Sequence, residues 1–193
     1  YLRYLEERAR GGGGLIISSD PAAFAIMAHS VTPPTRFIPG YMGDPDIIFP
    51  NPLTPEGRKY YDTTLIPIFR QQAEVAHRHG AACFGQLTHA GSYQIFANWQ
   101  PVSTASPIAD PFRCEVPHEL DVEEIKELVT VYGQTAKRVK EGGMDGLEIA
   151  AVHGLLLNEF ISPYTNHRTD QYGGSLENRL RIVMEILEGI RGY

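Results

Sequence analysis

At three points along this chain, a short glycine turn ends a helix-like segment and a brief apolar run follows at once. The turns are residues 11–14, Gly80 and residues 142–143, and the runs begin at Leu15, Ala82 and Gly146. A brief apolar run bounded by glycine is typical of a strand in a parallel sheet, because both faces of such a strand are covered. Each run is followed by a long polar stretch before the next helical pattern begins. The turns into the predicted strands are therefore short, and the loops out of them are long.

This asymmetry predicts the fold class. In a (β/α)8 barrel the active site is built from the loops at the carboxyl ends of the strands, so these loops are the long ones. A complete barrel has eight strands and about 250 residues, whereas only three strands are recognisable here. We therefore predict that residues 1–193 form one incomplete α/β domain, a partial (β/α)8 TIM barrel. The chain starts at Tyr1 without Met, inside a helical pattern, and we expect it to be part of a longer chain or of a homo-oligomer.

Apolar residues at helical spacing predict the segments between the strands. We expect helices over residues 1–10, about 65–79 with Pro67 in the first turn, 121–142 with a cap formed by Asp121 and Glu124, and from Ser175 onward. The stretches 21–57 and 91–117, rich in Pro and Gly, are expected to be irregular. In the loop over residues 162–175, Arg168 and Asp170 are expected to pair.

Composition excludes several classes of partner. The chain has 17 basic and 23 acidic side chains, a net charge of −6 and no Lys/Arg cluster, which argues against nucleic acid. No apolar run approaches the roughly 20 residues that span a bilayer, and no signal peptide is visible, so we expect no membrane contact. The two cysteines, Cys83 and Cys114, lack metal-ligand spacing. We expect no metal site and a cytoplasmic location.

Residues 146–179 carry the most specific pattern, GLEIAAVHGLLLNEFISPYTNHRTDQYGGSLENR. This block resembles the fourth strand and following loop of the old yellow enzyme family of FMN-dependent oxidoreductases. The run Arg-Thr-Asp-x-Tyr-Gly-Gly-Ser-x-x-Asn-Arg, from Arg168 to Arg179, is long enough to make chance agreement implausible. The resemblance extends over nearly the whole chain and places it at about the second to fourth βα units of the family's barrel.

The resemblance implies FMN as cofactor, NAD(P)H as reductant and a small-molecule substrate such as an activated alkene. It places Gln86, in the run Gln-Leu-Thr-His-Ala-Gly, against the pyrimidine ring of the flavin, because an amide offers a donor beside an acceptor. It places Ser18, Ser19 and Asp20 near the flavin at the end of the first visible strand, although loop capping would explain each of them as well. For His89 we expect a hydrogen bond within its own loop.

The expected catalytic residue is His153, which stands where the family has His or Asn. The family's other His and its Tyr proton donor are replaced by Ala150 and Leu155, whose side chains cannot donate hydrogen bonds. The sequence therefore leaves an alternative open, a non-catalytic barrel fragment or structural module that lacks the proton donor. A metal hydrolase that uses His89, His118 or His153 is a weaker hypothesis, because no His/Asp pair has ligand spacing.

Overall fold

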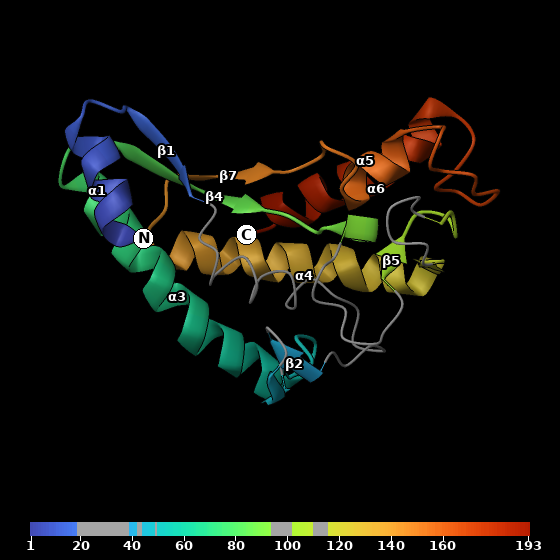
Figure 1. Cartoon of the computed structure of the whole chain (residues 1–193), viewed down its shortest axis with the longest axis horizontal. Helices are drawn as coiled ribbons and strands as arrows, with labels where there is room; N and C mark the ends of the chain where they lie inside the picture. Colours follow the sequence, from blue (N-terminus) through green and yellow to red (C-terminus); the bar gives the residue numbers. More distant parts are fainter. Residues whose placement is uncertain (19–38, 42–43, 49, 94–101, 110–115) are drawn as a thin grey trace.

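The computed structural model describes residues 1–18, 39–41, 44–48, 50–93, 102–109 and 116–193. Its centre is a three-stranded parallel sheet in the order β1-β4-β7 (Figure 1). The strands are β1 (Leu15–Ser18), β4 (Ala82–Leu87) and β7 (Gly146–Ile149). The predicted bounds of β4 and β7 are confirmed, and β1 extends one residue further than expected. Because all three strands run in the same direction, their carboxyl ends meet at one edge of the sheet.

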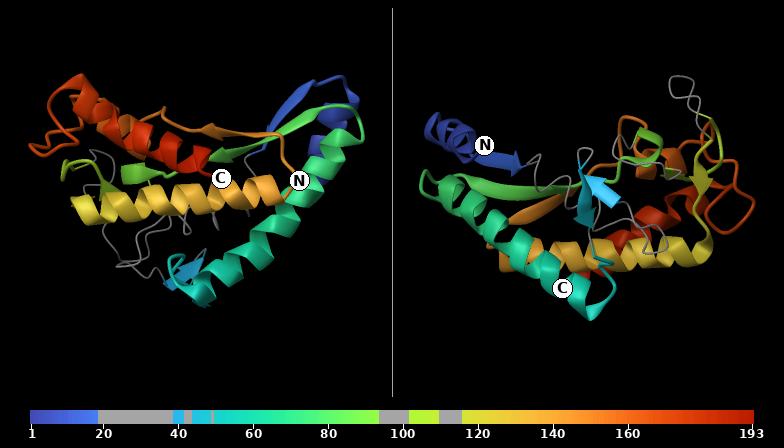
Figure 2. Two further views of the ribbon diagram at one scale, coloured as in Figure 1. Left: turned by 180° about the vertical axis from the view of Figure 1, so that it is seen from behind. Right: turned by 60° about the horizontal axis from the view of Figure 1, so that its bottom comes forward.

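Helices cover one side of this sheet and form the core with it. They are α1 (Leu2–Arg10), α3 (Pro55–His77), α4 (Val122–Glu141) and α6 (Leu176–Arg191). Figures 1 and 2 show α3 and α4 running along this side. Ile16, Cys83 and Leu87 point into the helix layer and are at most 8% exposed. Burial raises the pKa of the free Cys83 thiol to about 11, so this cysteine is an inert core residue.

The opposite face of the sheet would line the interior of a complete barrel. Side chains alternate between the two faces of a strand, and Leu15 and Ile17 on this face are 49% and 46% exposed. Strand register places Phe84 beside Gly146, where a Cβ atom on the glycine would lie 2.6 Å from the Phe84 ring. One face covered by helices and one open interior face are the geometry of part of a (β/α)8 barrel. The predicted fold class is confirmed.

Local capping signals set the ends of the long helices. Before α4, the Asp121 side chain accepts a hydrogen bond from the Glu124 N–H, and the Glu124 side chain accepts one from the Asp121 N–H, as a capping box predicts. Ser175 caps α6 by accepting from the Asn178 N–H. The predicted caps of both helices are confirmed.

The predicted start of α3 is wrong by ten residues. The helix begins at Pro55, because the Thr54 hydroxyl accepts a hydrogen bond from the Gly57 N–H and Pro55 occupies the first turn, where its missing N–H costs nothing. Pro67, which we expected in the first turn, lies inside the helix. The Thr-Pro pair at residues 54–55 was the true start signal.

The structure also has short elements that were not predicted, some of them in the stretches 21–57 and 91–117 that we expected to be irregular. They are an antiparallel pair of β2 (Pro39–Tyr41) and β3 (Asp44–Ile48), a 3-10 turn η1 (Gly91–Tyr93), a parallel pair of β5 (Ser103–Thr104) and β6 (His118–Glu119), and α5 (Leu156–Ile161). The last of these lies directly before the predicted loop over residues 162–175.

Candidate functional site

The candidate site lies at the carboxyl edge of the sheet, where the loops after β4 and β7 meet. Two backbone hydrogen bonds hold these loops together. The Ala150 N–H donates to the Leu87 carbonyl at 3.0 Å, and the Leu156 N–H donates to the His89 carbonyl at 3.1 Å. Side chains that follow two strands far apart in the sequence are thereby brought to one surface.

Gln86 occupies this edge on the interior face of β4. Its Nε2 donates a 2.8 Å hydrogen bond to the Glu148 carboxylate on β7, and strand register sets the two residues directly opposite each other. Among the described residues, no hydrogen bond reaches the Gln86 Oε1. Gln86 is therefore a partly exposed amide whose acceptor atom remains available, as the predicted flavin contact requires.

His153 lies in the turn between β7 and α5. Its backbone has φ 61°, in the left-handed region that non-glycine residues seldom adopt, and the following Gly154 has φ 76°. The Asn158 side chain stabilises this turn by accepting a 2.9 Å hydrogen bond from the Gly154 N–H. The His153 side chain is exposed, and in the described part of the chain nothing engages its ring. The His153 imidazole therefore lies exposed on a strained turn that follows the carboxyl end of β7.

Ala150 and Leu155 flank His153 on either side. Ala150 is 5% exposed, and Leu155 is the N-terminal capping residue of α5 without a side-chain hydrogen bond. Their apolar side chains leave His153 as the donor among these three positions.

Ser18 lies at the carboxyl end of β1, as expected, but its side chain points away from the interior face of the sheet. Its hydroxyl is buried on the helix side of β1 and donates a 2.6 Å hydrogen bond to Oε1 of Gln72 in α3. Strand alternation explains this, because Ser18 shares a face with the buried Ile16. Ser19 and Asp20, the other two residues predicted near the flavin, lie outside the described residues.

The predicted local hydrogen bond of His89 is confirmed. Its Nδ1 accepts a 3.1 Å hydrogen bond from the Gly91 N–H, and the side chain is fully enclosed. Burial lowers the pKa of His89 to about 4, so the ring is neutral at physiological pH. His89 is therefore a structural residue of the loop beside the site.

The Arg-Thr-Asp part of the most specific sequence block forms a structural clamp. The Arg168 side chain is 2% exposed, and its Nη1 donates to the carbonyls of Ala105 and Leu120 at 3.1 and 2.6 Å. Nε and Nη2 form the predicted pair with Asp170, and the guanidinium lies 5.7 Å from the centre of the Phe160 ring. Burial alone would raise the pKa of Asp170, but hydrogen bonds from Arg168 and the Tyr172 N–H outweigh it and hold the pKa below its usual value. Arg168 therefore joins the loop after β4, at Ala105 and Leu120, to the loop before α6.

A buried carboxylate, which the sequence did not reveal, forms a second link between the loops. Glu159 of α5 is 3% exposed and accepts hydrogen bonds from the Ser92 N–H at 2.9 Å and the Thr104 hydroxyl at 2.8 Å. Tyr93 and Gly154 help to line a pocket of about 270 Å³ next to it. The pocket therefore adjoins the turn that carries His153.

The residues present fit one part of FMN. The free Oε1 and the second N–H of Gln86 match the alternating N–H and C=O groups of a pyrimidine edge. No Lys or Arg side chain lies on the interior face of the three described strands, so the phosphate has no cationic partner there. Among these three strands, the chain thus has an amide that matches the flavin ring but no cation that would pair with the phosphate.

In the described residues, no group of three or more His, Cys, Asp or Glu side chains is arranged to hold a metal ion. His118, named in the metal hypothesis, forms a 2.7 Å pair with Glu124. None of the described helices combines the length and apolar character needed to cross a membrane.

Comparison with known proteins gives consistent matches. The profile of the NADH:flavin oxidoreductase / NADH oxidase family matches residues 51–192. An NADH oxidase from Thermoanaerobacter brockii is 40% identical over 193 residues, 98% of this chain and 26% of that protein. A multifunctional alkene reductase/demethylase from Caballeronia cordobensis is 31% identical over 193 residues, 99% of this chain and 25% of that protein. A solved complex of 2-naphthoyl-CoA reductase with 2-naphthoyl-CoA superposes with a TM-score of 0.75 at 28% identity, over 99% of this chain and 27% of that chain.

The chain spans about a quarter of the length of both curated relatives. The profile match begins before α3 and ends after α6, so it includes β4, β7 and the loops that form the site. These matches confirm the resemblance drawn from residues 146–179. The chain belongs to the NADH:flavin oxidoreductase / NADH oxidase family.

Proposed function

We propose that this chain is part of an FMN-dependent oxidoreductase that passes hydride from NAD(P)H through the flavin to an activated alkene or a related small molecule. The observation that carries the proposal is the partly exposed amide of Gln86 at the sheet edge, whose Oε1 accepts no hydrogen bond from any described residue. Its position at the carboxyl end of β4, in a chain of a flavin oxidoreductase family, supports a flavin contact.

Each described residue of the site has a separate task in this mechanism. Gln86 binds the pyrimidine edge of the flavin ring. Bound FMN supplies hydride transfer between NAD(P)H and the substrate. His153 donates a hydrogen bond to a substrate carbonyl, which stabilises the charge that develops there. Because Ala150 and Leu155 donate nothing, the proton for the α-carbon of an alkene must come from another residue or from water.

These two apolar residues also support a second candidate, a barrel module that retains the scaffold without the chemistry. Purification of the intact gene product that contains residues 1–193 separates the two. Flavin absorbance that bleaches anaerobically with NADH or NADPH and returns with a simple enone supports the enzyme. A protein that binds no flavin supports the module and contradicts the enzyme.

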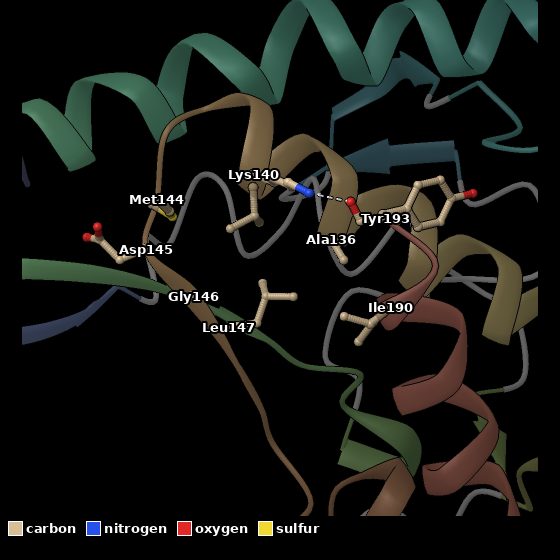
Figure 3. Close-up of a pocket in the computed structure, with 9 residues that line it drawn as sticks. Ala136, Lys140, Met144, Asp145, Gly146, Leu147, Ile190 and Tyr193 are labelled. Atoms are coloured by element: carbon tan, nitrogen blue, oxygen red, sulfur yellow. Dashed lines mark hydrogen bonds between the residues drawn. The ribbon is translucent and has the colours of Figure 1, made fainter.

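We further propose that residues 1–193 are one incomplete barrel domain of a longer chain. Among the described strands, β7 pairs only with β4, and an apolar groove runs along its other edge. Two adjoining pockets of about 450 and 540 Å³ form this groove, and both are lined by Leu147 and Ile190. Figure 3 shows these two side chains pointing into the space between β7 and α6. An unpaired edge beside an apolar groove fits a further strand of the same barrel.

A cytoplasmic location completes the proposal. It is supported by Cys83, which is a buried free thiol, as is usual in reducing compartments. Fractionation of the source cells, followed by immunodetection of the gene product, tests the location. Recovery outside the cytoplasmic fraction would contradict it.

A further inference from the structure

Glu148 is a charged residue on the interior face of β7, and its environment gives it a specific task. Two residues before Glu148 on the same face of β7 is Gly146, which lies opposite Phe84 of β4. Phe84 in turn lies opposite Ile17 of β1. The pair of Glu148 and Gln86 is therefore a polar layer on top of an apolar one, at the carboxyl edge of the sheet.

The pair fixes the orientation of the Gln86 amide. An ionised carboxylate has only acceptor atoms, so the group that faces Glu148 at 2.8 Å must be the NH2 of the amide. The Oε1 then points away from Glu148, and one N–H of Nε2 is left over. Without Glu148, the amide could rotate by 180° and exchange its donor and acceptor.

Orientation matters for the ligand that Gln86 is proposed to bind. A pyrimidine edge presents an N–H flanked by carbonyl groups, so it needs an acceptor and a donor in a fixed order. A rotated amide would set donor against donor and acceptor against acceptor. Leaving such groups unpaired in a closed site weakens binding.

We propose that Glu148 is a positioning residue, which holds the Gln86 amide in the one orientation that pairs with the pyrimidine edge of the flavin. This inference rests on the proposed function. It assigns Glu148 no contact with the flavin and no part in proton transfer. Glu148 acts through Gln86, and its effect must vanish when Gln86 is absent.

A double-mutant cycle on FMN affinity tests this dependence. The apoprotein of the intact gene product, with Glu148→Met, Gln86→Met and both changes, is titrated with FMN and followed by quenching of flavin fluorescence. We expect Glu148→Met to weaken FMN binding about tenfold, which corresponds to about 1.4 kcal/mol. In the Gln86→Met background, the same change should have no further effect. The visible spectrum of bound flavin should shift in both single variants in the same way.

Two more variants keep the result interpretable. Glu148→Gln can still accept from the Gln86 NH2, but it also permits the rotated amide, so it should weaken binding less than Glu148→Met does. If Glu148→Met fails to fold, Glu148→Gln takes its place in the double-mutant cycle. Glu123→Gln removes a carboxylate whose side chain is 77% exposed on α4 and should leave FMN affinity unchanged.

The outcomes separate this inference from the proposed function. Unchanged FMN affinity in Glu148→Met, or additive effects in the double variant, would overturn the positioning role while FMN binding by the unsubstituted protein still stands. An unsubstituted protein that binds no FMN would overturn both.

Discussion

The burial of His89 makes a quantitative prediction about stability in acid. Burial holds its pKa near 4 in the folded chain, whereas an unfolded histidine titrates near 6.5. Between these two values, the unfolded state binds more protons than the folded state, so stability falls as the pH falls. The contribution is complete above about pH 6.5 and is lost progressively toward pH 4. A difference of roughly 2.5 pH units corresponds to about 3 kcal/mol of unfolding free energy.

A single substitution isolates this contribution from other acid-sensitive groups such as Asp170. In His89→Asn, the side-chain oxygen can replace Nδ1 as acceptor for the Gly91 N–H, but the amide does not titrate. Urea unfolding, followed by circular dichroism from pH 4 to pH 8, gives the free energy of unfolding of the unsubstituted apoprotein and of His89→Asn. We expect the unsubstituted protein to lose about 3 kcal/mol more than His89→Asn does between pH 7 and pH 4. Parallel pH profiles would refute the argument that a buried neutral ring controls this loss.

Three further predictions follow from the clamp, the site and the open edge. Arg168→Met should lower the free energy of unfolding by about 3 kcal/mol in a urea titration, because two buried carbonyls lose their donor. Arg10→Met is the control, since the Arg10 side chain is 66% exposed, and it should lower this free energy little. Equal losses in the two variants would contradict the clamp. Ala150→His with Leu155→Tyr should speed the alkene-reducing half-reaction by about 10²–10³-fold in stopped-flow traces and leave flavin reduction by NAD(P)H nearly unchanged. An unchanged alkene step in the folded, flavin-loaded variant would refute the proposed roles of these two positions. Residues 1–193 produced alone should self-associate or aggregate in light-scattering measurements because the β7 edge is open, and a monodisperse monomer with cooperative unfolding would count against the incomplete barrel.

Elements with strong local signals could be predicted from the sequence. The strands β4 and β7 begin after glycine turns and consist of short apolar runs, and α4 begins with a capping box, so their bounds followed directly. The start of α3 was missed because Pro67 was taken for a first-turn proline although Pro55 was available. The short helix α5 has six residues and no side-chain cap, so no local pattern marked it.

The candidate site was predictable only in part, because its contacts are distant in sequence. Gln86 and His153 came from a resemblance to a known family. The partner of Gln86 is Glu148, 62 positions away, and only the strand register reveals that they meet. The orientation of Ser18 toward the helix layer could have been predicted, since alternation places it on the buried side with Ile16.

FMN binding by the intact gene product that contains residues 1–193 tests the central claim most directly. The apoprotein is titrated with FMN, both unsubstituted and as Gln86→Met, and quenching of flavin fluorescence reports the stoichiometry and the dissociation constant. The account predicts one FMN per chain and binding that is at least tenfold weaker in Gln86→Met, since the variant loses both an acceptor and a donor to the ring. Absence of binding, or equal affinity in the two proteins, would contradict the claim that this sheet edge holds a flavin.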